Sequence, residues 1–520
     1  MSSGFPWLTA LIVLPLLGAA AVWALPATRR RLVRPVALGF SLAEVALAVG
    51  AVLSFDTAQA GVHQLVETHS WIPALGVSYA VGVDGVGLLL ILLSVVLVPL
   101  VLLAAWNEQG STKEVVSGQL RHYMALILLT QVFMVAVFAA RDVFLFYVLF
   151  EAMLIPVYFL IGQFGGVRRR YAAVKFLLFS LAGGLVMLVG VIALYLEGPG
   201  GPQGFLTENL VGLDLPVGVE RWLFVAFFLA FAIKAPMFPV HTWLPDAAEQ
   251  APAGTSVLLV GVLDKVGTFG MLTLCLPLFP NASTWAAPVV IVLAVISILY
   301  GALLAIAQQD LMRLIAYTSV SHFGFIVLGI FAFTSLSVAG SSFYMVNHGL
   351  STGALFLIAG YLISRRGSRK IADFGGLQKV VPVLAGSFLV AGLSALSLPG
   401  LSTFVSEFMV LIGTFARDRP AAVVSAFAVV LAALYILLTY QRIFTGPVRD
   451  GLETMPDLNA HERWAVGPLI ALMLVVGFYP APALEFVNEP AQITLDQVGM
   501  QDVPSTVLVD DSAATEGSDK

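Results

Sequence analysis

The sequence predicts an all-α, polytopic membrane protein of about fourteen transmembrane helices. Hydrophobic residues make up 59% of the 520 residues and charged residues only 11%, whereas soluble globular domains contain about 25% charged residues. Apolar runs of about 20 residues, long enough to cross a ~30 Å hydrocarbon core as helices, recur along the chain. The period-two alternation of a membrane β-barrel is absent. A water-soluble fold and a barrel are therefore both excluded.

Each predicted span is one apolar run. The first run is predicted to be a retained helix, because no basic segment precedes it and no small-residue cleavage site follows it. The spans are predicted at residues 5–25, 36–54, 85–106, 123–140, 143–163, 172–196, 222–245, 256–279, 286–307, 314–335, 338–364, 382–413, 420–444 and 464–484.

Two of these spans contain helix-breaking residues beside a buried charge. Ala232–His241 in the seventh span includes two prolines, and Leu398–Glu407 in the twelfth begins with Leu-Pro-Gly. Interrupted segments at corresponding places in two halves are typical of internally repeated transporters. We therefore divide the chain into five parts, which are an N-terminal three-helix segment (1–122), a first five-helix repeat (123–279), a second five-helix repeat (286–444), a loop with the last transmembrane helix (445–490), and an acidic, flexible tail (491–520).

The positive charges predict the orientation of the chain. Basic clusters lie in alternate loops, at Arg29–Arg31, Arg168–Arg170 and Arg365–Lys370. Positive residues are retained on the cytoplasmic side. The opposite set of loops includes the stretch from Asp56 to Asp84, which has no Lys or Arg. Both termini are therefore predicted to lie outside.

Four ionisable side chains lie near mid-membrane depth: Glu151, Lys234, Lys265 and Glu407. A charge at the bilayer centre costs about 2.5 to 3.5 kcal/mol on insertion scales, so each one requires a reason. They could form a proton pathway, in which movement of Glu151 relative to Lys234 switches the lysine between holding and releasing a proton. Alternatively, Glu151 and Lys234 could form a static ion pair. Buried pairs stabilise weakly compared with apolar packing, which favours the pathway.

Histidines are the expected connecting groups, because imidazole accepts and donates protons near neutral pH. His322 in the tenth span and His348 in the eleventh are candidates for this relay, although each could instead be a neutral histidine bonded in the core. The roles of three further residues stay open. His241 ends the seventh span, Asp264 could be a local packing partner, and Lys175 could extend to the lipid headgroups.

Motifs for cofactors are missing from the sequence. A single cysteine, Cys275, leaves no ligand set for an iron–sulfur cluster. Neither a nucleotide-binding glycine motif nor a zinc-binding H-E-x-x-H motif occurs. We therefore expect this chain to bind no cofactor or metal, and the energy for transport to come from a partner or from a second ion gradient.

The motifs around these residues resemble those of the antiporter-like membrane subunits of respiratory complex I, the proton-pumping NADH:quinone oxidoreductase. The resemblance covers about residues 5–485 and is strongest in four segments, Phe150–Pro156, Ala232–Glu249, Leu263–Gly267 and Leu311–His322. It implies fourteen spans with two inverted five-helix repeats.

The resemblance also implies roles for the buried residues. Glu151 and Lys234 would be a coupled pair, and Lys265 the central relay lysine. His322 and His348 would connect Lys265 to an exit-side carrier, Glu407. Related subunits typically carry lysine at that last position, so Phe404–Phe408 favours the branch that includes mitochondrial subunit 4.

The family further implies partners and location. NADH, flavin, iron–sulfur clusters and quinone would belong to partner subunits, and the neighbours would include paralogous antiporter-like subunits and lipid, with no nucleic acid. The chain would lie in a bacterial plasma membrane and carry protons outward as part of a translocase with no redox centre of its own. Two alternatives stay open: a subunit of a multisubunit sodium/proton antiporter without redox partners, and a structural scaffold.

Overall fold

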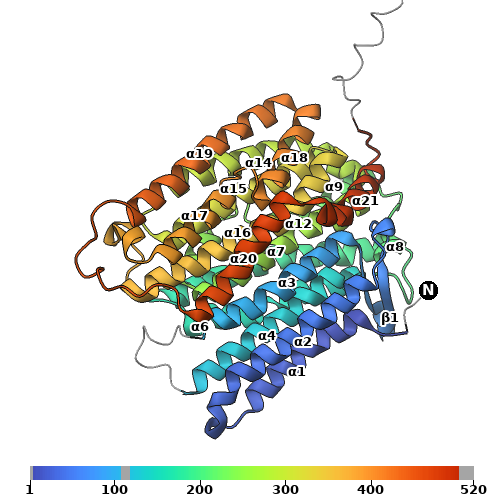
Figure 1. Cartoon of the computed structure of the whole chain (residues 1–520). Helices are drawn as coiled ribbons and strands as arrows, with labels where there is room; N and C mark the ends of the chain where they lie inside the picture. The colour runs from blue at the N-terminus through green and yellow to red at the C-terminus, as the bar shows by residue number, and fades with distance from the viewer. Residues whose placement is uncertain (1–3, 107–116, 503–520) are drawn as a thin grey trace, which may run out of the picture.

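A computed structural model describes residues 4–106 and 117–502. Long helices run side by side through the molecule, and the predicted all-α membrane class is confirmed (Figure 1). Twelve helices in the described ranges are long and apolar enough to cross a membrane. The two predicted spans that are missing from these twelve are the seventh and the twelfth, which the structure shows to be broken. The count of fourteen and the inverted repeats stay predictions.

The helices follow the order of the predicted spans. Through both halves of the seventh span they are α1 (Trp7–Ala24), α2 (Val33–Leu53), α3 (Gly85–Ala104), α4 (Ser117–Ala139), α5 (Val143–Ala152), α6 (Leu154–Phe164), α7 (Arg169–Glu197), α8 (Thr207–Leu210), α9 (Val217–Lys234) and α10 (Trp243–Gln250). The later α-helices are α11 (Ala253–Leu258), α12 (Lys265–Gly270), α13 (Leu276–Leu278), α14 (Pro280–Ala307), α15 (Leu311–Phe331), α16 (Ser335–Arg366), α17 (Pro382–Ala395), α18 (Ser402–Arg417), α19 (Arg419–Phe444), α20 (Ala460–Phe478) and α21 (Ala481–Gln497). Short 3-10 turns are η1 (Ala27–Leu32), η2 (Thr57–Gln59), η3 (Pro73–Leu75), η7 (Ile371–Asp373) and η8 (Leu377–Lys379).

One hairpin interrupts the helical fold. Strands β1 (Gln64–Ile72) and β2 (Val77–Val83) pair antiparallel, with His69 opposite Tyr79. The turn closes at Gly76, whose φ of 71° favours glycine. The all-α prediction missed this hairpin, although β2 is rich in valine, which favours strands. The strands lie at one end of the bundle with α8, α21 and the N-terminus (Figure 1), which we call the hairpin end. The opposite end, which carries the arginine clusters, is the basic end.

The seventh span is broken as predicted. Helix α9 stops at Lys234, because the next residue, Ala235, precedes Pro236 and takes a non-helical ψ of 72°. Side chains compensate for the lost helical bonds. The Trp243 indole N–H donates to the carbonyl oxygen of Ile233 at 2.9 Å. The break is therefore held inside protein, which is where irregular backbone is tolerated at membrane depth.

The twelfth span is broken in a comparable way. Between α17 and α18 the chain passes through Ser397, with a φ of 60°, and Gly400, with a φ of 90°. The Thr403 hydroxyl donates to the carbonyl oxygen of Ser394 at 2.5 Å across this break. The turn places Ser397 beside the second half of the span, where Glu407 lies.

The eighth span contains two π-helical segments that the sequence analysis did not predict. They are η5 (Leu259–Leu263) and η6 (Met271–Cys275), on either side of α12. Such π-bulges occur frequently at functional sites. Here they flank Lys265, which lies at the core of the bundle.

The last helix corrects one predicted boundary. Helix α21 continues to Gln497, so residues 491–497 are not a flexible tail. Val487, Ala491 and Leu495 recur at four-residue spacing and are all buried, in a helix that packs on α3 and α16. The end of the predicted tail, residues 503–520, lies outside the described residues.

Candidate functional site

The first part of the site is the pair predicted from the fifth and seventh spans. Glu151 lies in the last turn of α5, and Lys234 is the final residue of α9. The Lys234 ammonium is 1% exposed and lies 5.1 Å from the ring centroid of Phe150. The two charges interact electrostatically. However, they do not appear among the ion pairs within 4.0 Å that the described residues form, so the structure holds them near one another without a direct bond.

Asp264 connects this pair to the centre of the molecule. Its carboxylate is fully buried, and neither oxygen has a hydrogen-bond partner within the described ranges. It interacts electrostatically with both Lys234 and Lys265. The sequence left the role of Asp264 open, and the structure places its charge within range of the two lysines.

Lys265 occupies the centre of the site. Its fully buried ammonium donates to the carbonyl oxygen of Val260 at 2.5 Å, within the π-helical segment η5. Its Nζ also lies 2.7 Å from Nδ1 of His348 on α16. An ammonium group has donors only, so Nδ1 of His348 must accept this bond when Lys265 is charged. The lysine and the histidine predicted to follow it are therefore in direct contact.

The contacts continue from His348 to the twelfth span. The His322 and His348 rings are 5.3 Å apart between centroids. Nδ1 of His322 lies 2.7 Å from the Tyr344 hydroxyl, which donates to Glu407 at 2.7 Å. The Ser397 hydroxyl donates to the same carboxylate oxygen at 2.6 Å. The structure thus brings the predicted Lys265, His348, His322 and Glu407 together.

Tyr344 and Ser397 were missed in the sequence analysis. Tyr344 precedes His348 by four residues, and this spacing places both side chains on one face of α16. That signal was available in the sequence. Ser397 had no such signal, because its approach to Glu407 depends on the path of the chain through the break.

Lys175 belongs to a network of ion pairs at the basic end. Its Nζ lies 2.6 Å from Asp246, and Arg313 pairs with Asp246 at 2.6 Å and with Glu249 at 3.0 Å. Lys175 therefore bonds to protein rather than extending to the headgroups. A hollow of about 530 Å³ opens beside these carboxylates, lined also by Arg168.

His241 lies apart from the contacts that join Lys265 to Glu407. Its buried ring packs against the rings of Tyr300 and Tyr317, with centroids 5.3 and 6.4 Å away. Its Nδ1 has no hydrogen-bond partner among the residues that the structure covers. Among all the described residues, no group of three His, Cys, Asp or Glu side chains could hold a metal ion.

Broken helices that meet buried titratable side chains define a polytopic membrane subunit of the transporter type. Residues 140–433 match the family described as "NADH:quinone oxidoreductase/Mrp antiporter, TM". The chain belongs to this family.

Relatives and solved structures agree with this assignment. The chain is 47% identical to NADH-quinone oxidoreductase subunit M of Mycobacterium tuberculosis strain H37Rv, over 96% of each chain. It is 39% identical to subunit M of Rhodobacter capsulatus, over 84% of this chain and 85% of the relative. It superposes on a chain of respiratory complex I from Thermus thermophilus with a TM-score of 0.85 and 31% identity, over 95% of this chain and 100% of that one. Subunit M is the bacterial counterpart of mitochondrial subunit 4, so the resemblance to that branch, which Glu407 favoured, is confirmed.

A chain of the Mrp complex from Dietzia sp. DQ12-45-1b matches with a TM-score of 0.81 and 22% identity, over 95% of this chain and 100% of that one. This likeness shows a shared fold alone.

Proposed function

We propose that this chain is the proton-translocating membrane subunit of an NADH:quinone oxidoreductase in a bacterial plasma membrane. Partner subunits would bind NADH, flavin, iron–sulfur clusters and quinone, and their redox chemistry would drive transport. The observation that carries the proposal is the series of contacts from Lys265 through His348, His322 and Tyr344 to Glu407.

The direction of the hydrogen bonds supports this proposal. The Tyr344 hydroxyl has one hydrogen and donates it to Glu407. Nδ1 of His322 must then donate to the Tyr344 oxygen at the same time. These bonds form a wire in which each donor points toward Glu407. When His322 is an imidazolium, release of the Tyr344 proton to Glu407, with replacement from Nδ1 of His322, moves one positive charge along the wire and leaves both Tyr344 and His322 neutral.

Unpaired polar atoms support a hydrated connection between the remaining groups. Nζ of Lys234, Oε1 of Glu151, both oxygens of Asp264 and Nε2 of His348 are buried and lack hydrogen-bond partners in the described part of the chain. Leaving such a group unbonded costs about 1 to 3 kcal/mol. Buried polar groups without protein partners normally bind internal water. Water can therefore join the pair at Lys234 to the contact at Lys265.

In this proposal the basic end faces the cytoplasm, and protons enter near the network around Asp246. They load Lys234 or Lys265 and leave through Glu407 on the outer side. A neighbouring subunit would change the field on Glu151 and Lys234. Moving one charge against 100 mV costs ~2.3 kcal/mol, so a switch of a few kcal/mol in this pair is sufficient.

NADH-driven proton uptake into inverted membrane vesicles tests the proposal. Lys234→Ala and Glu151→Ala should each lower proton uptake by about tenfold or more, because each removes one proton-carrying side chain. Glu485→Gln, at an exposed position of α21, is the control and should pump normally. Flavin and cluster content would verify that the complex assembles. Normal uptake in both relay variants would contradict the proposal and leave the residues a structural role.

The subunits that co-purify with this chain distinguish the proposal from the sodium/proton antiporter alternative. The chain extracted in mild detergent should bring flavin-containing and cluster-containing subunits with it. A stable assembly that lacks both would favour the antiporter.

A further inference from the structure

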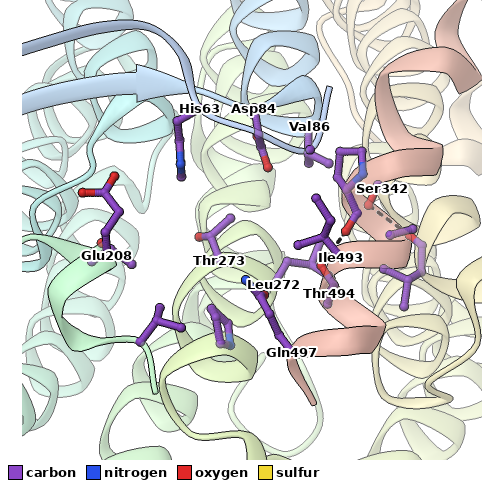
Figure 2. A pocket seen from close by; sticks show the side chains of 17 residues that line it. His63, Asp84, Val86, Glu208, Leu272, Thr273, Ser342, Ile493, Thr494 and Gln497 are labelled. Carbon is purple, nitrogen blue, oxygen red and sulfur yellow. Dashed lines mark hydrogen bonds between the residues drawn. The ribbon is translucent and has the colours of Figure 1, made fainter. Parts of the chain in front are cut away.

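A cavity of about 340 Å³ lies at the hairpin end, away from the contacts described above. Six segments that are distant in sequence form its walls: the loop before β1, the start of α3, α8, the π-helical segment η6, α16 and α21 (Figure 2). Helix α21 is fastened to this wall by Glu489, which accepts a hydrogen bond from the backbone N–H of Gly61 at 2.9 Å. The cavity is therefore built from the loops and helices that cover this end of the bundle.

Solvent reaches the eighth span in this cavity. From Ala253 to Leu278 every residue is buried except Thr273, which lines the cavity. Thr273 lies in η6, where the wider π-helical turn interrupts the regular helix. Its hydroxyl donates to the carbonyl oxygen of Phe269 at 2.9 Å, one turn further into the membrane.

The floor of the cavity lies close to the centre of the relay. Helix α16 runs alongside the eighth span in the opposite direction, and its Ser342 also lines the cavity. Further inward, Thr268 contacts the Met345 sulfur at 2.9 Å, and Lys265 contacts His348 at 2.7 Å. His348 lies six residues further along α16 than Ser342, a rise of about 9 Å. The two elements that line the cavity with Thr273 and Ser342 therefore also carry the Lys265–His348 contact, further into the membrane.

Two proton-binding side chains point into the cavity, as Figure 2 shows for His63 and Asp84. Asp84 caps α3 by accepting a bond from the backbone N–H of Gly87 at 2.7 Å. Burial raises the pKa of the Asp84 carboxyl, and His63 and this N–H oppose the shift.

Three charged side chains act on His63: Asp84 and Glu208, which line the cavity, and Arg141, which does not. Arg141 is itself bound to Glu208, at 2.8 Å through Nε. Because those two charges compensate one another, Asp84 exerts the largest electrostatic effect on His63. The side chains that α21 contributes to the cavity, such as Thr494, carry no charge.

We propose that this cavity is a second proton vestibule, in which His63 and Asp84 exchange protons between the eighth span and the solution at the hairpin end. The inference rests on the proposed function, and it adds an exchange site besides Glu407. A proton leaving the Lys265–His348 contact would cross by transient water past Thr273 and bind the Asp84 carboxylate or the His63 imidazole. Its release to bulk water restores the base. Phe269 and Leu272 are buried between the two sites, so the connection opens only when water enters.

Cysteine labelling tests whether solvent reaches the span. The chain has one cysteine, the buried Cys275. In a Cys275→Ala background, Thr273→Cys should react with a membrane-impermeant maleimide added at the hairpin end of the intact complex. Leu274→Cys, the buried neighbour, should stay unlabelled. Peptide mass spectrometry of this chain reads the result. Absence of label on Thr273→Cys would overturn the vestibule.

Proton pumping against a varied lumenal pH tests the exchange groups. Asp84→Asn removes the charge and keeps the helix cap, because asparagine caps as well as aspartate. Combined with His63→Gln, it should slow pumping by about threefold and flatten its dependence on lumenal pH over roughly pH 5 to 7, because desolvation lowers the pKa of the His63 imidazole and raises the pKa of the Asp84 carboxyl. The control is His69→Gln, because the native His69 ring stacks on Tyr79 and does not line the cavity.

Unchanged pH dependence in the double variant would overturn the vestibule, provided that Lys234→Ala and Glu151→Ala still lower pumping as expected. Normal pumping in those two relay variants would instead contradict the proposed function itself.

Discussion

The Nζ atom of Lys265 lies 2.7 Å from Nδ1 of His348, and this contact joins the eighth span to the eleventh. Neither residue could reach solvent by a change of rotamer alone, because both are fully buried. Lys265 also packs 5.0 Å from the ring centroid of Phe323, which stabilises its charged form. At this contact Lys265 is the proton donor, His348 is the acceptor, and the Phe323 ring packs beside the ammonium.

Tyr344→Phe tests the wire between His322 and Glu407. The substitution keeps the ring and removes the hydroxyl that bonds both residues at 2.7 Å. Proton pumping should fall by about fivefold or more, since general acid–base groups typically contribute at least that much. The control is Tyr440→Phe, which should pump normally because the Tyr440 ring packs on Phe444. Equal pumping by the two variants would show that protons bypass Tyr344.

Gly184→Ala tests the Glu151–Lys234 pair without removing a charge. A Cβ at Gly184 of α7 would collide with the carboxylate of Glu151, the mobile end of a flexible side chain. The carboxylate should move, so we expect slower pumping with little loss of stability. Gly190→Ala on the same helix meets only Ala226 and Phe227 side chains, at 3.1 Å, and is the control. Identical pumping in the two variants would argue that the position of Glu151 is unimportant.

Gly267→Ala tests how closely the eighth span approaches the break in the seventh. Its Cβ would lie 2.5 Å from the carbonyl oxygen of Phe231 and 2.6 Å from the amide nitrogen of Ala235, both backbone atoms. Overpacking of this kind costs about 1 to 3 kcal/mol, so the thermal unfolding midpoint of the purified complex should fall. At Gly353 a Cβ would lie 3.4 Å from a Val257 methyl group, an ordinary contact, so Gly353→Ala should leave the midpoint unchanged.

The sequence was sufficient for the fold class and for the two breaks. Long apolar runs specify helices in a membrane, and Pro236 and Pro399 cannot continue a helix. The hairpin was missed because only two strands form it, beside many helices. The π-helical segments around Lys265 could not be predicted, because they result from packing of the eighth span against its neighbours and have no composition of their own.

In the candidate site, too, some residues could be predicted from the sequence and others could not. Glu151, Lys234, Lys265 and Glu407 are conspicuous as charges in apolar runs, and the histidines are conspicuous by their chemistry. The partners of these residues are not visible in the sequence. Ser397 reaches Glu407 only through a turn with positive φ, and the cavity at Thr273 depends on six segments meeting at one end.

Lys265→Met tests the central claim most directly, because it removes the ammonium and retains an unbranched side chain of similar length. Protons pumped and NADH oxidised would be measured together in vesicles from the same preparation. We expect pumping to fall at least about tenfold, the scale of a lost proton carrier. A Lys265→Met complex that assembles and pumps at the unaltered rate would contradict a relay through Lys265 and His348.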